Sequence, residues 1–216
     1  KKLLFDRYIW VSGTGTMTKK YADVFFQNII KKLNVDFNDL ILEIASNDGT
    51  FLLPFVKRGF KKVLGVDPAK NIADLANKKK IKTLNQYWNL KNSIKIKKKF
   101  GPAKIVFARN VIPHVSDLLD VIKGIEHILE EDGIGAIEFH DAAQIQKDLQ
   151  YDSIYHEHLC YFSLKSITFL LKKFNLNLFD VKESPINGGS KLVFFSKKKL
   201  NVSNALLNAQ NQEIEN

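Results

Sequence analysis

The sequence predicts an α/β fold built on a mostly parallel seven-stranded sheet, with one antiparallel strand near the C-terminus and helices on both faces. Short apolar runs recur along the chain, and most are separated by stretches whose apolar residues have helical spacing. The first run, residues 40–44, ends in a polar turn that contains a glycine and leads into a helical pattern. Repetition of this strand–turn–helix unit is typical of parallel sheets that are covered by helices.

The expected strands are short, apolar and bounded by turn residues. They cover residues 40–44, 62–66, 81–84, 103–109, 134–139, 176–181 and 192–195. Helical spacing predicts helices over residues 17–33, 50–58, 69–77, 88–99, 116–130 and 164–174. Ser116 and Ser163 are the expected N-caps of the last two helices. The turn Asn187-Gly188-Gly189-Ser190 favours antiparallel pairing of the last two strands.

Length and composition set bounds on the domain organisation. With 216 residues, of which 45% are hydrophobic, the chain suffices for one large domain, or for one domain with an appendage. We expect an N-terminal segment or linker over residues 1–15, the main domain over residues 16–200, and a helical segment or linker to a further domain over residues 201–216. The first residue is Lys1 rather than a methionine, which suggests a piece of a longer protein.

The net charge of +10 comes almost entirely from lysine, because the only arginines are Arg7, Arg58 and Arg109. Proteins that read bases and phosphates rely on the planar fork of arginine, which lysine lacks. The lysine runs stand at expected ends of helices and strands, where a solvated surface accounts for them. We therefore predict no nucleic-acid partner.

The remaining composition argues against a membrane span and a metal site. No apolar run approaches about 18 residues and no signal-peptide pattern opens the chain, so we expect a cytoplasmic protein that does not enter a membrane. Cys160 is the only cysteine, which excludes a disulfide within these residues and a zinc site built on several cysteines. His156 and His158 are two residues apart, rather than the four that place both on one helical face. We predict no metal.

The turn after the first strand carries Glu43, Asn47, Asp48 and Gly49. Gly49 allows the backbone to approach a ligand closely, and Asn47 or Asp48 is suited to cap the next helix. A pyrophosphate requires backbone N–H groups without nearby negative charge, normally in a G-x-G-x-x-G sequence. Two carboxylates with a single glycine favour a cationic or hydroxyl-rich ligand instead. An ordinary strand–turn–helix connection is the alternative.

Polar residues also follow the second and fourth expected strands. Asp67 lies about 20 residues after the first turn, where an acidic side chain in such folds commonly binds ribose hydroxyls. Asn110 and His114 follow the fourth strand. Because ligands bind at the carboxyl ends of parallel strands, these side chains are candidates for one shared site. The alternative for Asn110 and His114 is that the backbone satisfies them within a loop.

The densest group of reactive side chains is Tyr155-His156-Glu157-His158, which lies beyond the fifth expected strand. A histidine takes up a proton near neutral pH, and a neighbouring glutamate orients or stabilises it. Tyr155 is suited to donate a hydrogen bond to a developing oxyanion. These residues favour general acid–base chemistry on an acceptor that must lose a proton, such as a hydroxyl or a C–H beside a carbonyl. The alternative is a histidine-rich loop that packs under a helix.

Taken together, these motifs resemble those of the sugar C-methyltransferases that act on nucleotide-linked ketodeoxysugars. That family belongs to the class I S-adenosylmethionine-dependent methyltransferases, which have a Rossmann-like fold. The similarity covers most of residues 3–197, and the Tyr-His-Glu-His block is its most specific part. The matching pieces are Glu43-Ile44-Ala45-Ser46-Asn47-Asp48-Gly49-Thr50, Gly65-Val66-Asp67-Pro68, Ala108-Arg109-Asn110-Val111 with His114, Ile154-Tyr155-His156-Glu157-His158, and Asn187-Gly188-Gly189-Ser190.

The resemblance implies a reaction and a role for each motif. Residues 16–200 would form an S-adenosylmethionine-binding methyltransferase domain, and the acceptor would be a nucleotide-linked keto sugar. His158 would remove the proton from the sugar carbon next to the keto group, and that carbon would then accept the methyl group. The residues implied at the sugar and its enolate are Tyr155, Glu157 and His114, with Tyr8 and His156 as further substrate contacts. The residues implied at the methyl donor are Glu43, Asn47, Gly49, Asp67 and Asn110.

The chain departs from the family pattern at two positions. Ala45 stands where glycine is usual, and Lys191 stands where an arginine usually follows Gly-Gly-Ser, so a bidentate contact there is in question. The family also usually carries a cysteine-rich zinc module before this region and a second α/β domain after it, and these 216 residues include neither. A small-molecule O-methyltransferase and a non-catalytic donor-binding domain stay open as alternatives, and no feature specifies an oligomeric state.

Overall fold

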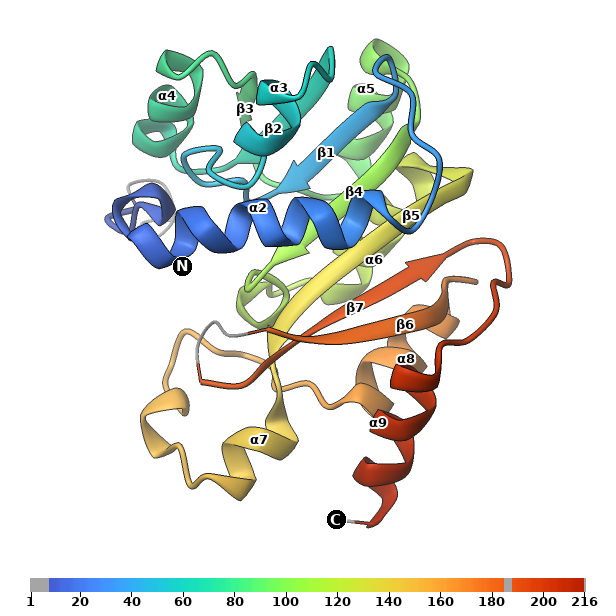
Figure 1. Cartoon of the computed structure of the whole chain (residues 1–216). Coiled ribbons are helices and arrows are strands. Elements are labelled where there is room, and N and C mark those ends of the chain that lie inside the picture. The colour runs from blue at the N-terminus through green and yellow to red at the C-terminus, as the bar shows by residue number, and fades with distance from the viewer. Residues whose placement is uncertain (1–7, 185–187, 216) are drawn as a thin grey trace.

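A computed structural model describes residues 8–184 and 188–215. Residues 1–7 of the expected N-terminal segment, Asn187 of the expected turn and Asn216 lie outside this part. The described chain forms a seven-stranded sheet in the order β3-β2-β1-β4-β5-β7-β6 (Figure 1). Its strands are β1 (Leu40–Ile44), β2 (Lys62–Asp67), β3 (Thr83–Asn85), β4 (Ala103–Arg109), β5 (Leu129–His140), β6 (Asn177–Ser184) and β7 (Ser190–Ser196).

Strand β7 is the antiparallel member of this sheet. It pairs antiparallel with β5 on one side and with β6 on the other, whereas the pairs among β1 to β5 are parallel. The expected mostly parallel sheet with one antiparallel strand near the C-terminus is therefore confirmed. The antiparallel connection from β6 to β7 passes through Gly188 and Gly189, both of which have positive φ angles of 69° and 132°.

The direction in which the sheet grows reverses at β1. This strand pairs with β2 on one side and with β4 on the other, so the chain crosses from one half of the sheet to the other after β3. In open α/β sheets, ligands bind in the crevice that opens beyond the carboxyl ends of the strands at such a point. The turns after β1, β2 and β4 are therefore the first place to look for a site.

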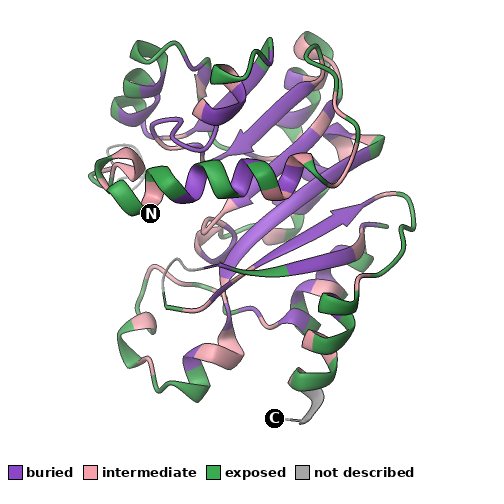
Figure 2. Cartoon of the chain, viewed as in Figure 1, coloured by how far each residue is buried: buried purple, intermediate pink, exposed green. Residues whose placement is uncertain are grey.

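Helices cover both faces of the sheet, as the sequence predicts (Figure 1). They are α2 (Thr16–Ile30), α3 (Leu53–Lys57), α4 (Lys70–Lys78), α5 (Leu90–Phe100), α6 (Leu118–Ile128), α7 (Ala142–Lys147), α8 (Leu164–Lys172) and α9 (Asn204–Glu215). Their buried sides face the strands and their exposed sides face solvent, which gives the alternation of colour along each helix in Figure 2.

Alternation along the strands divides the core into two clusters. In β4, Ile105 and Phe107 point toward the face covered by α2, where the rings of Phe25 and Phe107 lie 4.9 Å apart. Val106 and Ala108 point toward the opposite face and join the cluster that contains α5, α6 and α8. Because both faces of β4 are buried, its sequence reads as a continuous apolar run rather than as an alternating one.

Two of the expected helix starts differ from those in the structure. The helix after the first turn begins at Leu53, and neither Asn47 nor Asp48 caps it. The Asp48 carboxylate is instead bonded to the Thr50 hydroxyl, at 2.7 Å, and to Lys79. Helix α6 is capped by Asp117 rather than by Ser116, because the Asp117 side chain accepts the Asp120 N–H at 3.0 Å.

Other boundaries are confirmed or extended. Ser163 caps α8 in a reciprocal capping box with Ser166, as expected for the cap. Strand β5 begins at Leu129 instead of at residue 134, and α7 was not predicted. The division of the chain at residues 15 and 200 remains a prediction. In the described part of the chain, no helix is long and apolar enough to cross a membrane.

Candidate active site

A cavity of about 1220 Å³ opens at the carboxyl edge of the sheet. The turns that follow β1, β2, β4 and β5 form its floor, and the segment around residues 150–158 forms one of its walls. Residues of the N-terminal segment, among them Tyr8, Trp10 and Ser12, also line it. A cavity of this volume, lined by aromatic rings and a few convergent polar groups, is typical of a site for small molecules.

The N-terminal segment is held to the cavity by Asn47. The Asn47 side-chain amide donates to the Trp10 carbonyl at 3.0 Å, and its oxygen accepts the Ser12 N–H at 2.9 Å. A second contact joins Asn71 to the Tyr8 carbonyl at 2.8 Å. Asn47 lines the cavity as expected, but its amide is engaged with the backbone of the N-terminal segment. In this structure its side chain fastens that segment across the first turn.

The first turn itself contains three residues with positive φ. Ala45, Asn47 and Gly49 have φ angles of 52°, 50° and 77°. The left-handed conformation explains why glycine suits position 45, since alanine pays a steric cost there of about 1–2 kcal/mol. Gly49 does not line the cavity, and a side chain at this position would meet Ile81 at 2.7 Å. The close approach of Ile81 and the positive φ therefore explain why a glycine stands at position 49.

Glu43 lies beneath the first turn with only 3% of its surface exposed. Its Oε2 atom has no hydrogen-bond partner among the described residues, and the side chain does not line the cavity. Burial raises the pKa of Glu43 well above its usual value, and the nearby Asp48, Asp67 and Glu138 raise it further against the opposing effect of Arg109. Such a carboxyl ionises readily only when a cation arrives nearby.

Asp67 ends β2 within 2.8 Å of the first turn. Its Oδ2 atom accepts the Asn47 N–H at 2.8 Å, and its Oδ1 atom accepts the Ala69 N–H at 2.9 Å. Burial raises the pKa of Asp67, while these two backbone hydrogen bonds lower it. Asp67 lines the cavity. The pKa of the Tyr8 hydroxyl is raised by burial first, and then by the negative charges of Glu157 and Asp67. A carboxylate fixed in this way retains lone pairs for ligand hydroxyls.

A buried ion pair fixes the end of β4. Arg109 donates to both carboxylate oxygens of Glu138, from Nε at 2.9 Å and from Nη2 at 3.1 Å. Glu138 is fully buried, and its carboxylate also accepts the Ser184 hydroxyl at 3.0 Å. The Arg109 guanidinium stacks on Phe51, with its carbon 3.2 Å from the ring centroid. The pair therefore joins β4, β5 and β6 to the residues that follow the first turn.

The same pair orients Asn110. The Asn110 N–H donates to the Glu138 carbonyl at 2.8 Å, and its side-chain amide lies 3.4 Å from the Glu138 carboxylate. Asn110 adopts a φ of 50° and lines the cavity. Tyr21 of α2 donates to the same carboxylate at 3.4 Å, and burial together with the Glu138 charge raises the pKa of Tyr21 to about 12. Tyr21 therefore remains a protonated donor over the physiological pH range.

At the other end of the cavity, the hydrogen bonds of His158 define its tautomer. The Nδ1 atom lies 3.0 Å from the Ser153 carbonyl, which can only accept, so Nδ1 carries the proton of the neutral ring. Nε2 is then the basic nitrogen, and it lies 3.2 Å from the hydroxyl of Tyr155. Both side chains line the cavity. In the neutral ring, the lone pair of Nε2 and the Tyr155 hydroxyl thus face one another at the cavity wall.

His114 is oriented in the same manner. Its Nδ1 atom lies 3.1 Å from the Glu157 carbonyl, which can only accept, so Nδ1 carries a proton. The rings of His114 and His158 have centroids 4.7 Å apart. The Glu157 carbonyl accepts the hydrogen bond from His114. Burial is the largest cause of the raised pKa values of Tyr8 and Tyr155, and the negative charge of Glu157 is the next largest.

The structure brings together most of the residues that the sequence singles out. The predicted residues that line the cavity are Tyr8, Asn47, Asp67, Asn110, His114, Tyr155 and His158. Those that do not line it are Glu43, Gly49, His156 and Glu157. His156 is exposed and packs edge-on to Tyr155, with ring centroids 6.2 Å apart. Within residues 8–184 and 188–215, no cluster of three or more His, Cys, Asp or Glu residues is suited to a metal.

Several contributors were missed by sequence reasoning. Glu138 interrupts the apolar run of residues 134–139 within β5, which is a signal for a buried functional or structural charge. His140 lines the cavity, and its Nε2 atom is buried without a hydrogen-bond partner among the described residues. Lys191, which stands at the position where the family usually has arginine, forms ion pairs with Asp141 at 3.0 Å and with Glu183 at 3.1 Å. Its ammonium group is therefore engaged by carboxylates of the protein.

Comparison with known proteins places this geometry in a family. A family model described as a methyltransferase domain matches residues 13–181. The chain belongs to this methyltransferase-domain family. The match includes the first turn, Asp67, Asn110 and the Tyr155–His158 segment, which are the parts of the chain that build the cavity.

Individual relatives agree with this assignment. The chain is 30% identical over 192 residues to C-methyltransferase NovU of Streptomyces niveus, in a match that covers 89% of this chain and 46% of that protein. The chain thus spans about half the length of this relative. The magnesium protoporphyrin IX methyltransferase of Synechocystis PCC 6803 with bound SAH has a similar fold, with a TM-score of 0.63 and 10% identity over 86% of this chain and 89% of that one. An S-adenosylmethionine-dependent methyltransferase of Clostridium acetobutylicum gives 0.61, at 14% identity over 84% and 92%.

Replacement of Glu138 tests the buried ion pair. Glu138→Ala leaves Arg109 buried without its partner, so the free energy of unfolding should fall by about 3–5 kcal/mol. Urea denaturation measures this change, and Glu131→Ala, at a carboxylate whose side chain is 80% exposed, serves as the control. The double variant Arg109→Met/Glu138→Leu should lose less than Glu138→Ala, because it leaves no unpaired charge. A loss below about 1 kcal/mol for Glu138→Ala contradicts this account.

Replacement of Glu43 tests the raised pKa. In the pH range above its ordinary pKa of 4.5 the folded protein holds a proton that the unfolded chain releases, so stability should fall as the pH rises through that range. Glu43→Gln removes this dependence and should raise the free energy of unfolding at pH 8 by about 1–3 kcal/mol, with little change at pH 4. Chemical denaturation at several pH values measures the effect. The prediction is contradicted if the free energy of unfolding of Glu43→Gln depends on pH as strongly as that of the unmodified protein and of the control Glu131→Gln.

Proposed function

We propose that this chain transfers a methyl group from S-adenosylmethionine to the carbon next to the keto group of a nucleotide-linked sugar. The observation that carries the proposal is the contact between His158 Nε2 and the Tyr155 hydroxyl, 3.2 Å apart, in the wall of a cavity whose other end is built on Asp67. Methylation at carbon requires removal of a C–H proton, and this pair provides a base and an oxyanion donor side by side. Identity of 30% to a C-methyltransferase supports the same reaction.

The donor end of the cavity fits S-adenosylmethionine. This molecule carries an ammonium group, a ribose diol and a methyl group on a positively charged sulfur, which is the chemistry it supplies when bound. Asp67 lines the cavity and offers a fixed carboxylate for the diol, whereas Glu43 lies beneath the first turn, outside the lining. A carboxylate on the cavity floor favours a cationic or hydroxyl-rich ligand and disfavours a pyrophosphate. Asn110, held by Glu138, completes the floor.

The acceptor end supplies the proton transfer. When an acceptor lies between the two groups, the His158 Nε2 atom takes the proton from the carbon beside the ketone, and the Tyr155 hydroxyl, released from Nε2, donates to the oxygen on which negative charge develops. The donor would supply its methyl group to the resulting enolate carbon and leave as the neutral thioether. His158 would keep the proton until solvent removes it. His114, fixed by the Glu157 carbonyl, holds the sugar beside the base.

A hydroxyl acceptor is the second candidate. The same His158 Nε2 atom can remove a proton from an alcohol, and the donor end of the cavity would be unchanged. An O-methyltransferase does not require an enolisable carbon in its acceptor. Mass analysis of products from a panel of keto sugars and hydroxylated small molecules separates the two reactions.

Proton exchange tests the base directly. When the protein is incubated with a nucleotide-linked keto sugar in deuterated water, deuterium should enter the carbon beside the ketone. His158→Ala should slow this exchange by about 10²- to 10⁴-fold, which is the usual contribution of a positioned base. NMR follows the loss of the proton signal, and His127→Ala, in the last turn of helix α6 and outside the cavity lining, provides a control histidine. If His158→Ala exchanges this proton as fast as the unmodified protein does, His158 is not the base. If the unmodified protein gives neither exchange nor a methylated product, the proposed function is overturned.

A further inference from the structure

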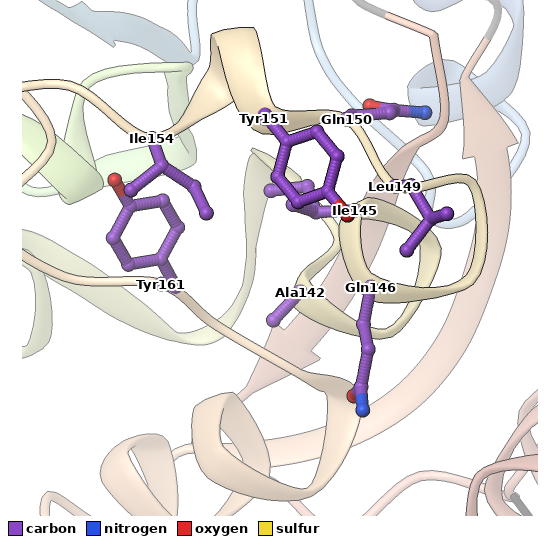
Figure 3. Close-up of a pocket in the computed structure, with 8 residues that line it drawn as sticks. All are labelled: Ala142, Ile145, Gln146, Leu149, Gln150, Tyr151, Ile154 and Tyr161. Atoms are coloured by element: carbon purple, nitrogen blue, oxygen red, sulfur yellow. The ribbon is translucent and has the colours of Figure 1, made fainter.

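A second cavity, of about 350 Å³, lies beside the acceptor end of the first. Helix α7 provides one wall, and the chain between residues 149 and 161 provides the other. Figure 3 shows Ile154 and Tyr161 on one side of the hollow and Leu149 and Gln146 on the other, with the Tyr151 ring between them. The lining is almost entirely apolar, apart from the amides of Gln146 and Gln150 and the two phenol groups.

Folding stability does not explain these side chains. Leu149, Tyr151 and Ile154 are 63%, 71% and 61% exposed, although all three are large and apolar. Leu149 also adopts a positive φ of 52°, which is an unfavourable conformation for a residue with a side chain. A strained backbone and a group of exposed apolar residues at one cavity are typical of a binding surface.

The second cavity is joined to the acceptor end through shared groups. Gln150 lines both cavities. Tyr161, in the wall of the second cavity, packs edge-on to His158 with ring centroids 5.8 Å apart. The Tyr161 hydroxyl donates at 3.4 Å to the Ser153 carbonyl, which is the same atom that fixes His158 Nδ1. The second cavity therefore lies within one residue of the first, on the side of His158 and Gln150.

We propose that this cavity binds the nucleobase of the nucleotide-linked acceptor, an inference that rests on the proposed function. A nucleobase is planar and presents two apolar faces, which suit a slot between tyrosine, leucine and isoleucine side chains. The edge of the base carries hydrogen-bond donors and acceptors, which the amide of Gln146 can satisfy at the rim. The lining contains no lysine or arginine, so the phosphates lie outside the cavity, between the base and the sugar.

Nucleotides without a sugar acceptor test the cavity separately from catalysis. Uridine diphosphate and thymidine diphosphate are titrated into the 216-residue chain by calorimetry, with ribose 5-phosphate as a probe that lacks the base. The two nucleotides should bind, and Tyr151→Ala and Leu149→Ala should each weaken their binding by about 5- to 100-fold, as expected for loss of contacts to a base. Phe169→Ala, at an equally exposed ring on α8 (64%), should leave binding unchanged.

The outcomes distinguish this inference from the proposed function. Equal binding of ribose 5-phosphate, or nucleotide binding that Tyr151→Ala and Leu149→Ala do not change, overturns the base site. Nucleotide binding that depends on Tyr151, without exchange or methylation of any keto sugar, supports the base site and overturns the function. If the unmodified protein methylates a nucleotide-linked keto sugar, Tyr151→Ala should raise KM with kcat nearly unchanged, because the base lies away from the reacting carbon. A loss of kcat alone contradicts the inference.

Discussion

The buried pair of Arg109 and Glu138 is the interaction on which the cavity floor around Asn110 depends. It joins the ends of β4 and β5 through bidentate hydrogen bonds, and Ser184 of β6 donates to the same carboxylate. Arg109 also stacks on Phe51, just after the first turn, so the pair spans the sheet from the donor end toward β6. Buried pairs of this type contribute little net stability compared with apolar residues, but they penalise every arrangement that separates the partners. The pair thus specifies where Asn110 lies more than it strengthens the fold.

A second constraint is the accumulation of negative charge at the carboxyl edge. Glu43, Asp48 and Glu138 are all buried near one another, and Arg109 is the cation that opposes the raised pKa of Glu43. A fold selected only for stability would have an apolar residue at position 43, since a buried carboxyl group with an incomplete set of hydrogen bonds costs free energy. The Oε2 atom of Glu43 has no partner within residues 8–184 and 188–215, so that part of the chain does not offset this cost.

The sequence predicts the fold well because the relevant signals are local. Apolar runs and turn residues locate the strands, and the acidic residues that close β1 and β2 identify the edge where the cavity opens. The capping of α3 was wrong because Asn47 and Asp48 bond to Trp10, Ser12 and Lys79, which are distant in sequence. Glu138 was overlooked for the same reason, since its partners lie on other strands and only the folded sheet brings them together.

The acceptor end shows most clearly what residue types alone leave open. Histidine and tyrosine in one segment indicate acid–base chemistry, but the direction of proton transfer depends on which ring nitrogen is protonated. The backbone contributes to this, because the carbonyls of Ser153 and Glu157, which can only accept, lie within hydrogen-bond distance of Nδ1 of His158 and of His114. Both carbonyls belong to one short segment, so its conformation orients both rings at once. The same Ser153 carbonyl accepts the Tyr161 hydroxyl from the wall of the second cavity, so the orientation of His158 and the shape of that wall depend on one backbone atom.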